Sequence, residues 1–212
     1  MPVKKVGVIG PTDLPLLARL IMENTRPTPA EIEQEEARVR GRAALIGRIL
    51  AELGLELWVN SETRGVPFEV AKSYKENRGP KLVALVAGGR EPWPPAPAGG
   101  TESFADEVRV ERDWFWANYV EVSRTDAVIA AGLSPGTFSE FGYIAWDLRL
   151  AEIMDTPSSL KHLVVVKEFL QANRPEFPEE RVLSLLLEKP VAPILQYIDK
   201  VEELREILQL FP

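Results

Sequence analysis

The sequence predicts an α/β fold, a doubly wound and mostly parallel Rossmann-like sheet with helices on both faces. Short apolar runs alternate with longer amphipathic segments along the chain, and this alternation is typical of βαβ units. The short runs are apolar on both faces, as buried parallel strands are. With 212 residues the chain has the natural size of one α/β domain, so we expect a single Rossmann-like nucleotide-binding domain over residues 1–212.

The composition argues against several classes of function. The net charge is −7 and the isoelectric point is near 5.0, whereas binding to nucleic acids or anionic membranes needs a basic surface. No cysteine is present, which excludes disulfides, thiolate ligands and a cysteine nucleophile, and the single histidine, His162, argues against a Ser-His-Asp triad or a multi-histidine metal site. Since the sequence shows neither a signal-peptide pattern nor a run of roughly 18 apolar residues, we expect a cytoplasmic protein without metal, membrane or nucleic-acid partners.

The first expected strand, residues 4–10, ends in the turn Gly10-Pro-Thr-Asp13 and leads into a short helix over 14–22. Gly10 and Thr12 would then lie at the carboxyl end of a strand, where open α/β sheets bind ligands. We therefore take Gly10 and Thr12 as candidate phosphate-binding residues. The alternative is a plain strand-to-helix turn.

A long amphipathic helix is expected next, over residues 29–53. Thr28 and Glu31 form a capping box, Pro29 takes the first helical position, and Gly54 suits the position after the last turn. A strand over 55–60, a helix over 67–77 and a strand over 81–87 follow.

The middle of the chain combines a short expected strand over 107–110 with a helix over 114–122 rich in aromatic residues. Trp114, Phe115, Trp116 and Tyr119 fall within this helix. Such a cluster packs in a core, forms a dimer interface or stacks on a nucleobase, and the sequence leaves these alternatives open. Beyond residue 134 we expect helices over 138–154, 179–188 and the C-terminal residues, a strand over 160–166, and an edge strand over 189–198 that contains two prolines.

The stretch from Ala127 to Glu140 carries the strongest functional signal. An apolar run over residues 127–131 predicts a buried strand, and Ser134 and Pro135 suit the N-cap and first position of a following helix. A strand that runs into a helix N-terminus directs free N–H groups and the positive end of the helix dipole at one spot, which favours a phosphate. The candidate phosphate-binding residues here are Ser134, Gly136 and Thr137, and Glu140 lies one turn further along the same face.

This stretch resembles the PGGxGTxxE loop of the lysine-decarboxylase-like Rossmann family, which includes the cytokinin-activating nucleoside-monophosphate phosphoribohydrolases. Gly136, Thr137 and Glu140 match the final Gly, Thr and Glu of that loop, while residues 132–134 replace its Pro, Gly and Gly. The resemblance implies hydrolysis of the N-glycosidic bond of a nucleoside monophosphate, with Glu140 stabilising the ribosyl cation or orienting water. It also implies a homodimer. We expect no cofactor, because nothing marks a lysine site for pyridoxal phosphate.

The sequence departs from the family at two places. The family has a glycine-rich loop, GGGxxGLMG, after the second strand, and of those glycines only Gly65 is present; Arg64 is either a compensating phosphate ligand or a solvated arginine. The family's catalytic arginine falls between Arg112 and Arg124, and we take Arg112 as the candidate. The prediction is therefore that the chain binds a nucleotide or other phosphorylated small molecule, with catalysis by Glu140 and Arg112 or, alternatively, as a non-catalytic binding or sensing domain.

Overall fold

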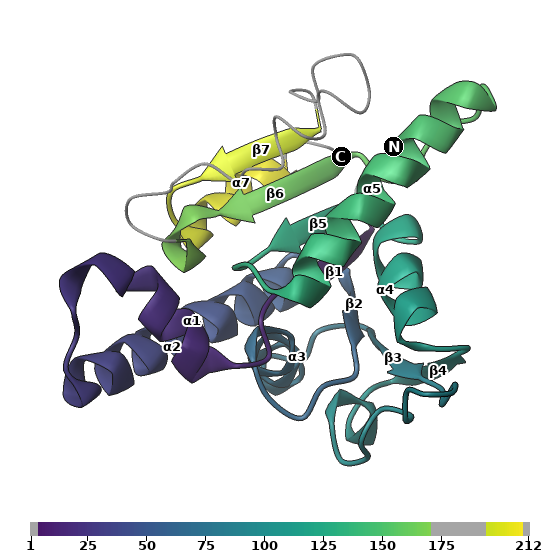
Figure 1. Ribbon diagram of the computed structural model, residues 1–212. Coiled ribbons are helices and arrows are strands. Elements are labelled where there is room, and N and C mark those ends of the chain that lie inside the picture. The colour runs from purple at the N-terminus through teal and green to yellow at the C-terminus, as the bar shows by residue number, and fades with distance from the viewer. Residues whose placement is uncertain (1–3, 171–193, 210–212) are drawn as a thin grey trace.

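The computed structural model describes residues 4–170 and 194–209. Within them a seven-stranded sheet has the order β4-β3-β2-β1-β5-β6-β7 (Figure 1). Every neighbouring pair of strands is parallel, so the predicted doubly wound sheet is confirmed. The strands are β1 (Lys5–Ile9), β2 (Glu56–Asn60), β3 (Leu82–Ala87), β4 (Glu107–Glu111), β5 (Ala127–Ala130), β6 (His162–Val166) and β7 (Leu195–Ile198).

Helices cover both faces of this sheet (Figure 1). The alternation of side chains along β1 shows the division, since Val6 and Val8 pack toward one face and Ile9 toward the other. The first face is covered by α1 (Leu14–Ile21), α2 (Pro29–Glu52), α3 (Val66–Glu76) and α7 (Leu204–Gln209). The second face is covered by α4 (Trp114–Ser123) and α5 (Pro135–Ile153).

The predicted helix boundaries follow from the capping residues. Thr28 caps α2 with the full capping box, in which the Thr28 N–H donates to Glu31 Oε2 at 2.7 Å. Gly54 has φ +68° directly after that helix, as the sequence predicts. The expected helix over 179–188 and the first part of the expected strand over 189–198 lie outside the described residues, while residues 195–198 form β7 at one edge of the sheet.

The order of strands places a switch point between β1 and β5. The chain proceeds outward from β1 through β2 and β3 to β4, then returns to the other side of β1 to form β5. The loops that leave β1 and β5 therefore lead to helices on opposite faces of the sheet, which opens a crevice at the carboxyl ends of these two strands. The two loops lie side by side there, since a Cβ added at Gly10 would be 2.8 Å from the Ala131 carbonyl oxygen. In the described part of the chain, no helix is both long and apolar enough to cross a bilayer.

Candidate functional site

A cavity of ≈ 250 Å³ lies at this switch point. Five parts of the fold build it: the end of β1 with the turn after it, the end of β2 with the loop after it, the start of α3, the inner face of α4 and the first turns of α5. The polar residues that line it are Thr12, Asn60, Glu62, Asn118, Glu121, Ser134, Thr137 and Glu140, together with the glycines Gly10 and Gly136.

The α5 N-terminus forms one wall of the cavity. Ser134 has the extended N-cap conformation, and its Oγ accepts from the Thr137 N–H at 3.1 Å and lies 3.0 Å from Thr137 Oγ1. Pro135 has no N–H, so helix geometry leaves the Gly136 N–H as the first-turn donor without an intrahelical partner. A Cβ at Gly136 would meet only Ser134 Oγ, at 3.6 Å. A ligand can therefore approach this backbone closely.

All but one of the predicted site residues line this one cavity. Gly10 and Thr12 come from the β1 turn, and Ser134, Gly136, Thr137 and Glu140 from α5. Their roles as phosphate ligands and catalyst remain predictions. Arg112 is not among the lining residues: its side chain is 67% exposed, its Nε donates to Asp113 Oδ2 at 3.1 Å, and its guanidinium lies 5.2 Å from the Trp116 ring centroid. The geometry gives the catalytic assignment of Arg112 no support.

The electrostatic character of the cavity is acidic. The pKa of Glu140 is raised to about 8, mainly by burial and also by the neighbouring charge of Glu62, while a hydrogen bond from Asn60 acts in the lowering direction. Burial likewise raises the pKa of Glu62 to about 7, against the lowering effect of Arg64. Glu121, only 1% exposed, has a pKa well above its usual range because of burial and then the charge of Glu140. Among residues 4–170 and 194–209, no lysine or arginine lines the cavity to offset these carboxyl groups.

Sequence reasoning did not identify Asn60 and Glu121 as site residues. The Asn60 amide nitrogen donates to Asn118 Oδ1 at 2.9 Å and to Glu140 Oε1 at 3.3 Å. The Asn60 Oδ1 and Glu121 Oε1 atoms are buried and have no hydrogen-bond partner within the described part of the chain. A signal for Glu121 was present, because a glutamate four residues after the small Ala117 falls on the buried stripe of an otherwise apolar helix.

The aromatic helix α4 contributes one ring to the cavity. Trp114 lines it, and the indole nitrogen of Trp114 donates to the Pro94 carbonyl oxygen at 2.9 Å. Phe115 and Trp116 are instead 49% and 41% exposed, which excludes the core alternative for both.

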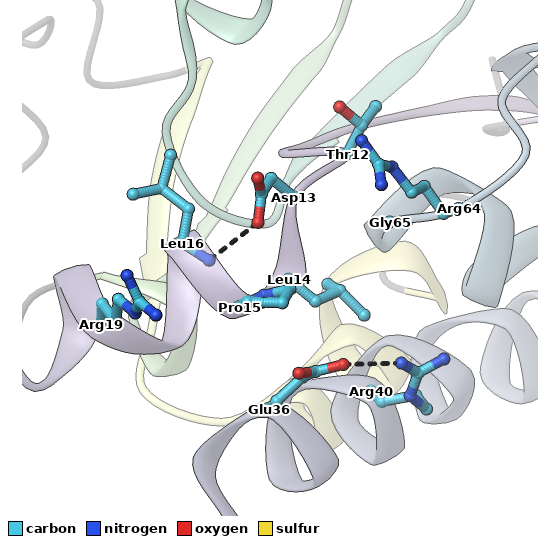
Figure 2. Close-up of a pocket in the computed structure, with 10 residues that line it drawn as sticks. All are labelled: Thr12, Asp13, Leu14, Pro15, Leu16, Arg19, Glu36, Arg40, Arg64 and Gly65. Carbon is cyan, nitrogen blue, oxygen red and sulfur yellow. Dashed lines mark hydrogen bonds and ion pairs between the residues drawn. The ribbon is translucent and has the colours of Figure 1, made fainter. Parts of the chain in front are cut away.

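A second cavity, of ≈ 520 Å³, lies on the other side of Thr12, and Thr12 lines both (Figure 2). Figure 2 shows three arginines around it, Arg19 from α1, Arg40 from α2 and Arg64 from the loop before α3. Arg40 is paired with Glu36 at 2.8 Å and also with Glu69. No ion pair joins Arg19 or Arg64 to a carboxylate within the described ranges, 4–170 and 194–209.

Gly65 separates these two cavities rather than cradling a ligand. Its backbone has φ +90° and ψ −172°, a region that only glycine populates readily. A Cβ there would be 2.3 Å from Thr12 Cα and 2.6 Å from the Pro11 carbonyl oxygen. Gly65 therefore allows the loop before α3 to pack directly against the β1 turn, where the Val66 N–H donates to the Pro11 oxygen at 2.9 Å.

Comparison with known proteins shows the class of fold. No protein-family model matches the sequence, and no curated protein matches it. The structure of the molybdenum cofactor carrier protein from Chlamydomonas reinhardtii matches with a TM-score of 0.59 at 16% identity, over 98% of this chain and 97% of that one. The molybdenum cofactor binding protein from the phototrophic bacterium Rippkaea orientalis matches with a TM-score of 0.61 at 16% identity, over 99% and 98% of the two chains. At such identities the likeness shows a Rossmann-like α/β fold.

Proposed function

We propose that the cavity between β1 and β5 binds a nucleotide or another phosphorylated small molecule, with the phosphate at the first turn of α5. The observation that carries the proposal is the convergence of the β1 turn and the α5 N-terminus on one cavity at the switch point. The two similar structures are of proteins that bind or carry the molybdenum cofactor, so folds of this kind hold a small molecule elsewhere.

Hydrolysis of an N-glycosidic bond is the second candidate, favoured by the position of Glu140 in the same cavity as the α5 turn. A carboxylate there would stabilise a developing ribosyl cation or orient the attacking water. Because the pKa of Glu140 is raised to about 8, most of this group carries a proton at neutral pH, and such a reaction would accelerate as the pH rises through 8. Because the cavity lining given by the described residues is acidic and includes no arginine, binding without turnover is the first candidate and hydrolysis the second.

The experiment is calorimetric titration of AMP and GMP into the wild type, Gly136→Val and the control Gly142→Val. A branched side chain at Gly136 would block the approach to the backbone N–H, and each charge-assisted hydrogen bond lost is worth about 1.5–3 kcal/mol. We expect affinity to fall by about tenfold to a hundredfold or more. Gly142 lies in the same helix with nothing within 4 Å of an added Cβ, so its variant makes the same replacement in α5 without touching the cavity.

Equal affinity of Gly136→Val and the wild type for both monophosphates would overturn the assignment of the α5 turn. Release of the free base, followed in parallel, separates the two candidates. Base release by the wild type that disappears in Glu140→Gln would establish hydrolysis, and binding without base release would leave a binding or sensing domain. Homodimer formation and a cytoplasmic location remain predictions from the sequence.

A further inference from the structure

The orientation of the Asn60 amide is fixed by a relay of hydrogen bonds that begins in α5. Ser139 Oγ donates to the Gly136 carbonyl oxygen at 2.7 Å, so it accepts from the Asn118 amide nitrogen at 3.2 Å. Asn118 Oδ1 is then directed to accept from the Asn60 nitrogen at 2.9 Å. The reverse orientation of Asn60 would place its oxygen against Asn118 Oδ1, an acceptor. Asn60 Oδ1 is therefore an acceptor that points elsewhere.

Two buried acceptors of the cavity wall consequently lack donors. Asn60 is 9% exposed and Glu121 is 1% exposed, and both line the cavity. Neither Asn60 Oδ1 nor Glu121 Oε1 has a hydrogen-bond partner among the residues that the structure describes. An unpaired buried acceptor is costly, and native structures keep few of them without a functional reason. A phosphate, which offers mainly acceptors, would not satisfy these two atoms. Burial raises the pKa of Glu121, so its carboxyl group carries a proton at neutral pH until N–H donors stabilise the carboxylate form. Asn60 Oδ1 and the ionised Glu121 together call for a ligand group with more than one N–H donor.

The shape of the inner wall favours a flat ring over an aliphatic amine. Trp114 lines the same cavity, and its hydrogen bond to Pro94 holds the plane of the indole in place. Pro67 and Pro135 add further apolar surface. Base-on-aromatic stacking is a common means of binding a heterocycle whose edge is read by polar groups.

We propose that Asn60, Glu121 and Trp114 receive a planar heterocycle that presents a ring N–H beside an exocyclic amino group, the 2-amino-4-oxo-pyrimidine edge shared by guanine and pterins. This inference rests on the proposed function and adds the class of ring to it. Adenine offers an amino group beside an acceptor nitrogen, which would face an acceptor of the wall. Hypoxanthine keeps the ring N–H and lacks the amino group.

The test is calorimetric titration of the wild type with GMP, IMP, AMP and ribose 5-phosphate, with unsubstituted pterin as a fifth probe. We expect GMP to bind at least tenfold more tightly than AMP, with IMP between them, because a matched donor pair discriminates by about this factor. Glu121→Gln keeps the shape and replaces an acceptor by an amide that can donate, so the advantage of GMP over IMP should disappear. Asn60→Leu keeps the size of the side chain and removes the other acceptor. If Glu121→Gln does not fold, the preference for GMP is tested with Asn60→Leu instead.

Each outcome separates this inference from the proposed function. Binding of GMP, IMP and AMP within a factor of two of one another overturns the inference and leaves nucleotide binding intact. If no phosphorylated probe binds, ribose 5-phosphate included, and pterin does not bind either, both the inference and the proposed function are overturned. If pterin alone binds, and its binding depends on Asn60 and Glu121, the ring site is supported without the phosphate site. A preference for GMP with no binding of pterin assigns the edge to guanine, and tight binding of pterin with weak GMP assigns it to a pterin.

Discussion

Two cavities separated by Thr12 differ in charge. The cavity between β1 and β5 contains the helix N-terminus that the sequence predicts as an anion site, yet carboxyl groups from β2, α4 and α5 line it. The neighbouring cavity contains Arg19, Arg40 and Arg64 (Figure 2). The carboxyl edge of the sheet fixes where the two cavities lie, while side chains from different elements set the charge of each.

The partition between the two cavities depends on a close contact of two loops. Gly65 packs against Thr12 and Pro11 without room for a Cβ, and Gly10 packs against the Ala131 carbonyl in the same manner. The β1 turn is thus held between the β2 and β5 loops, so the polar groups of Thr12 are presented to both sides. A change at this contact should affect both cavities together.

The largest effect is expected for Gly65→Ala. Its backbone conformation excludes other residues at a cost of about 1–3 kcal/mol, and the added Cβ must displace backbone atoms, for which overpacking typically adds about 1–3 kcal/mol. Gly54→Ala is the matched control, because Gly54 also has positive φ but nothing lies within 4 Å of an added Cβ. Urea unfolding should show a loss for Gly65→Ala that clearly exceeds the loss for Gly54→Ala. Equal losses would mean that the loops are not held together at Gly65.

The carboxyl groups of the cavity between β1 and β5 should make the stability of the protein depend on pH. In the folded chain the pKa of Glu62 is raised to about 7 and that of Glu140 to about 8, and that of Glu121 is raised as well. The folded state therefore holds protons that the unfolded state has already released, so the free energy of unfolding falls as pH rises from about 5 through 8. Each such proton contributes a slope of about 1.4 kcal/mol per pH unit.

Glu140→Gln removes one of these groups and should make that slope shallower, so that the variant gains stability relative to the wild type above pH 8. The exposed Glu33, on α2, provides the control: Glu33→Gln should follow the wild-type slope. Chemical unfolding at pH 6, 7, 8 and 9 measures the difference. Parallel curves for the wild type and Glu140→Gln would show that Glu140 ionises normally in the folded protein.

The sequence predicts the parts of the site that depend on local structure. Ser134 caps α5 and Pro135 takes its first turn as expected, because capping depends on residues three apart in the chain. The alternation of apolar runs and helices predicts the parallel sheet, while the strand order, which brings Gly10 beside Ala131, comes from the structure.

The charge of the site could not be predicted in this way. Asn60 meets Asn118 and Glu140 only through contacts 58 and 80 residues apart, so no local pattern shows that its oxygen is left without a donor. Arg112 lies near the expected position in the chain, but its ion pair with Asp113 and its contact with Trp116 hold it at the surface. Arg64 occupies the second cavity, and the sequence alone left both of its alternatives open.

The smallest effect is expected for Arg64→Gln, which tests whether the phosphate belongs to the α5 turn or to the arginine-lined cavity. If the α5 turn holds the phosphate, Arg64 acts only at a distance across Thr12, and salt screens such an exposed charge within about 8 Å at physiological ionic strength. The affinity of the better-binding monophosphate should then fall by less than about threefold, and by less still in 0.5 M KCl. Arg48→Gln, near the end of α2 and paired with Glu52 at 3.9 Å, controls for the change in net charge. A loss above tenfold for Arg64→Gln, with Arg48→Gln unchanged, would move the phosphate into the arginine-lined cavity. The α5 turn would then lie beside the sugar or the ring instead, and the acidic lining would no longer need to tolerate a phosphate.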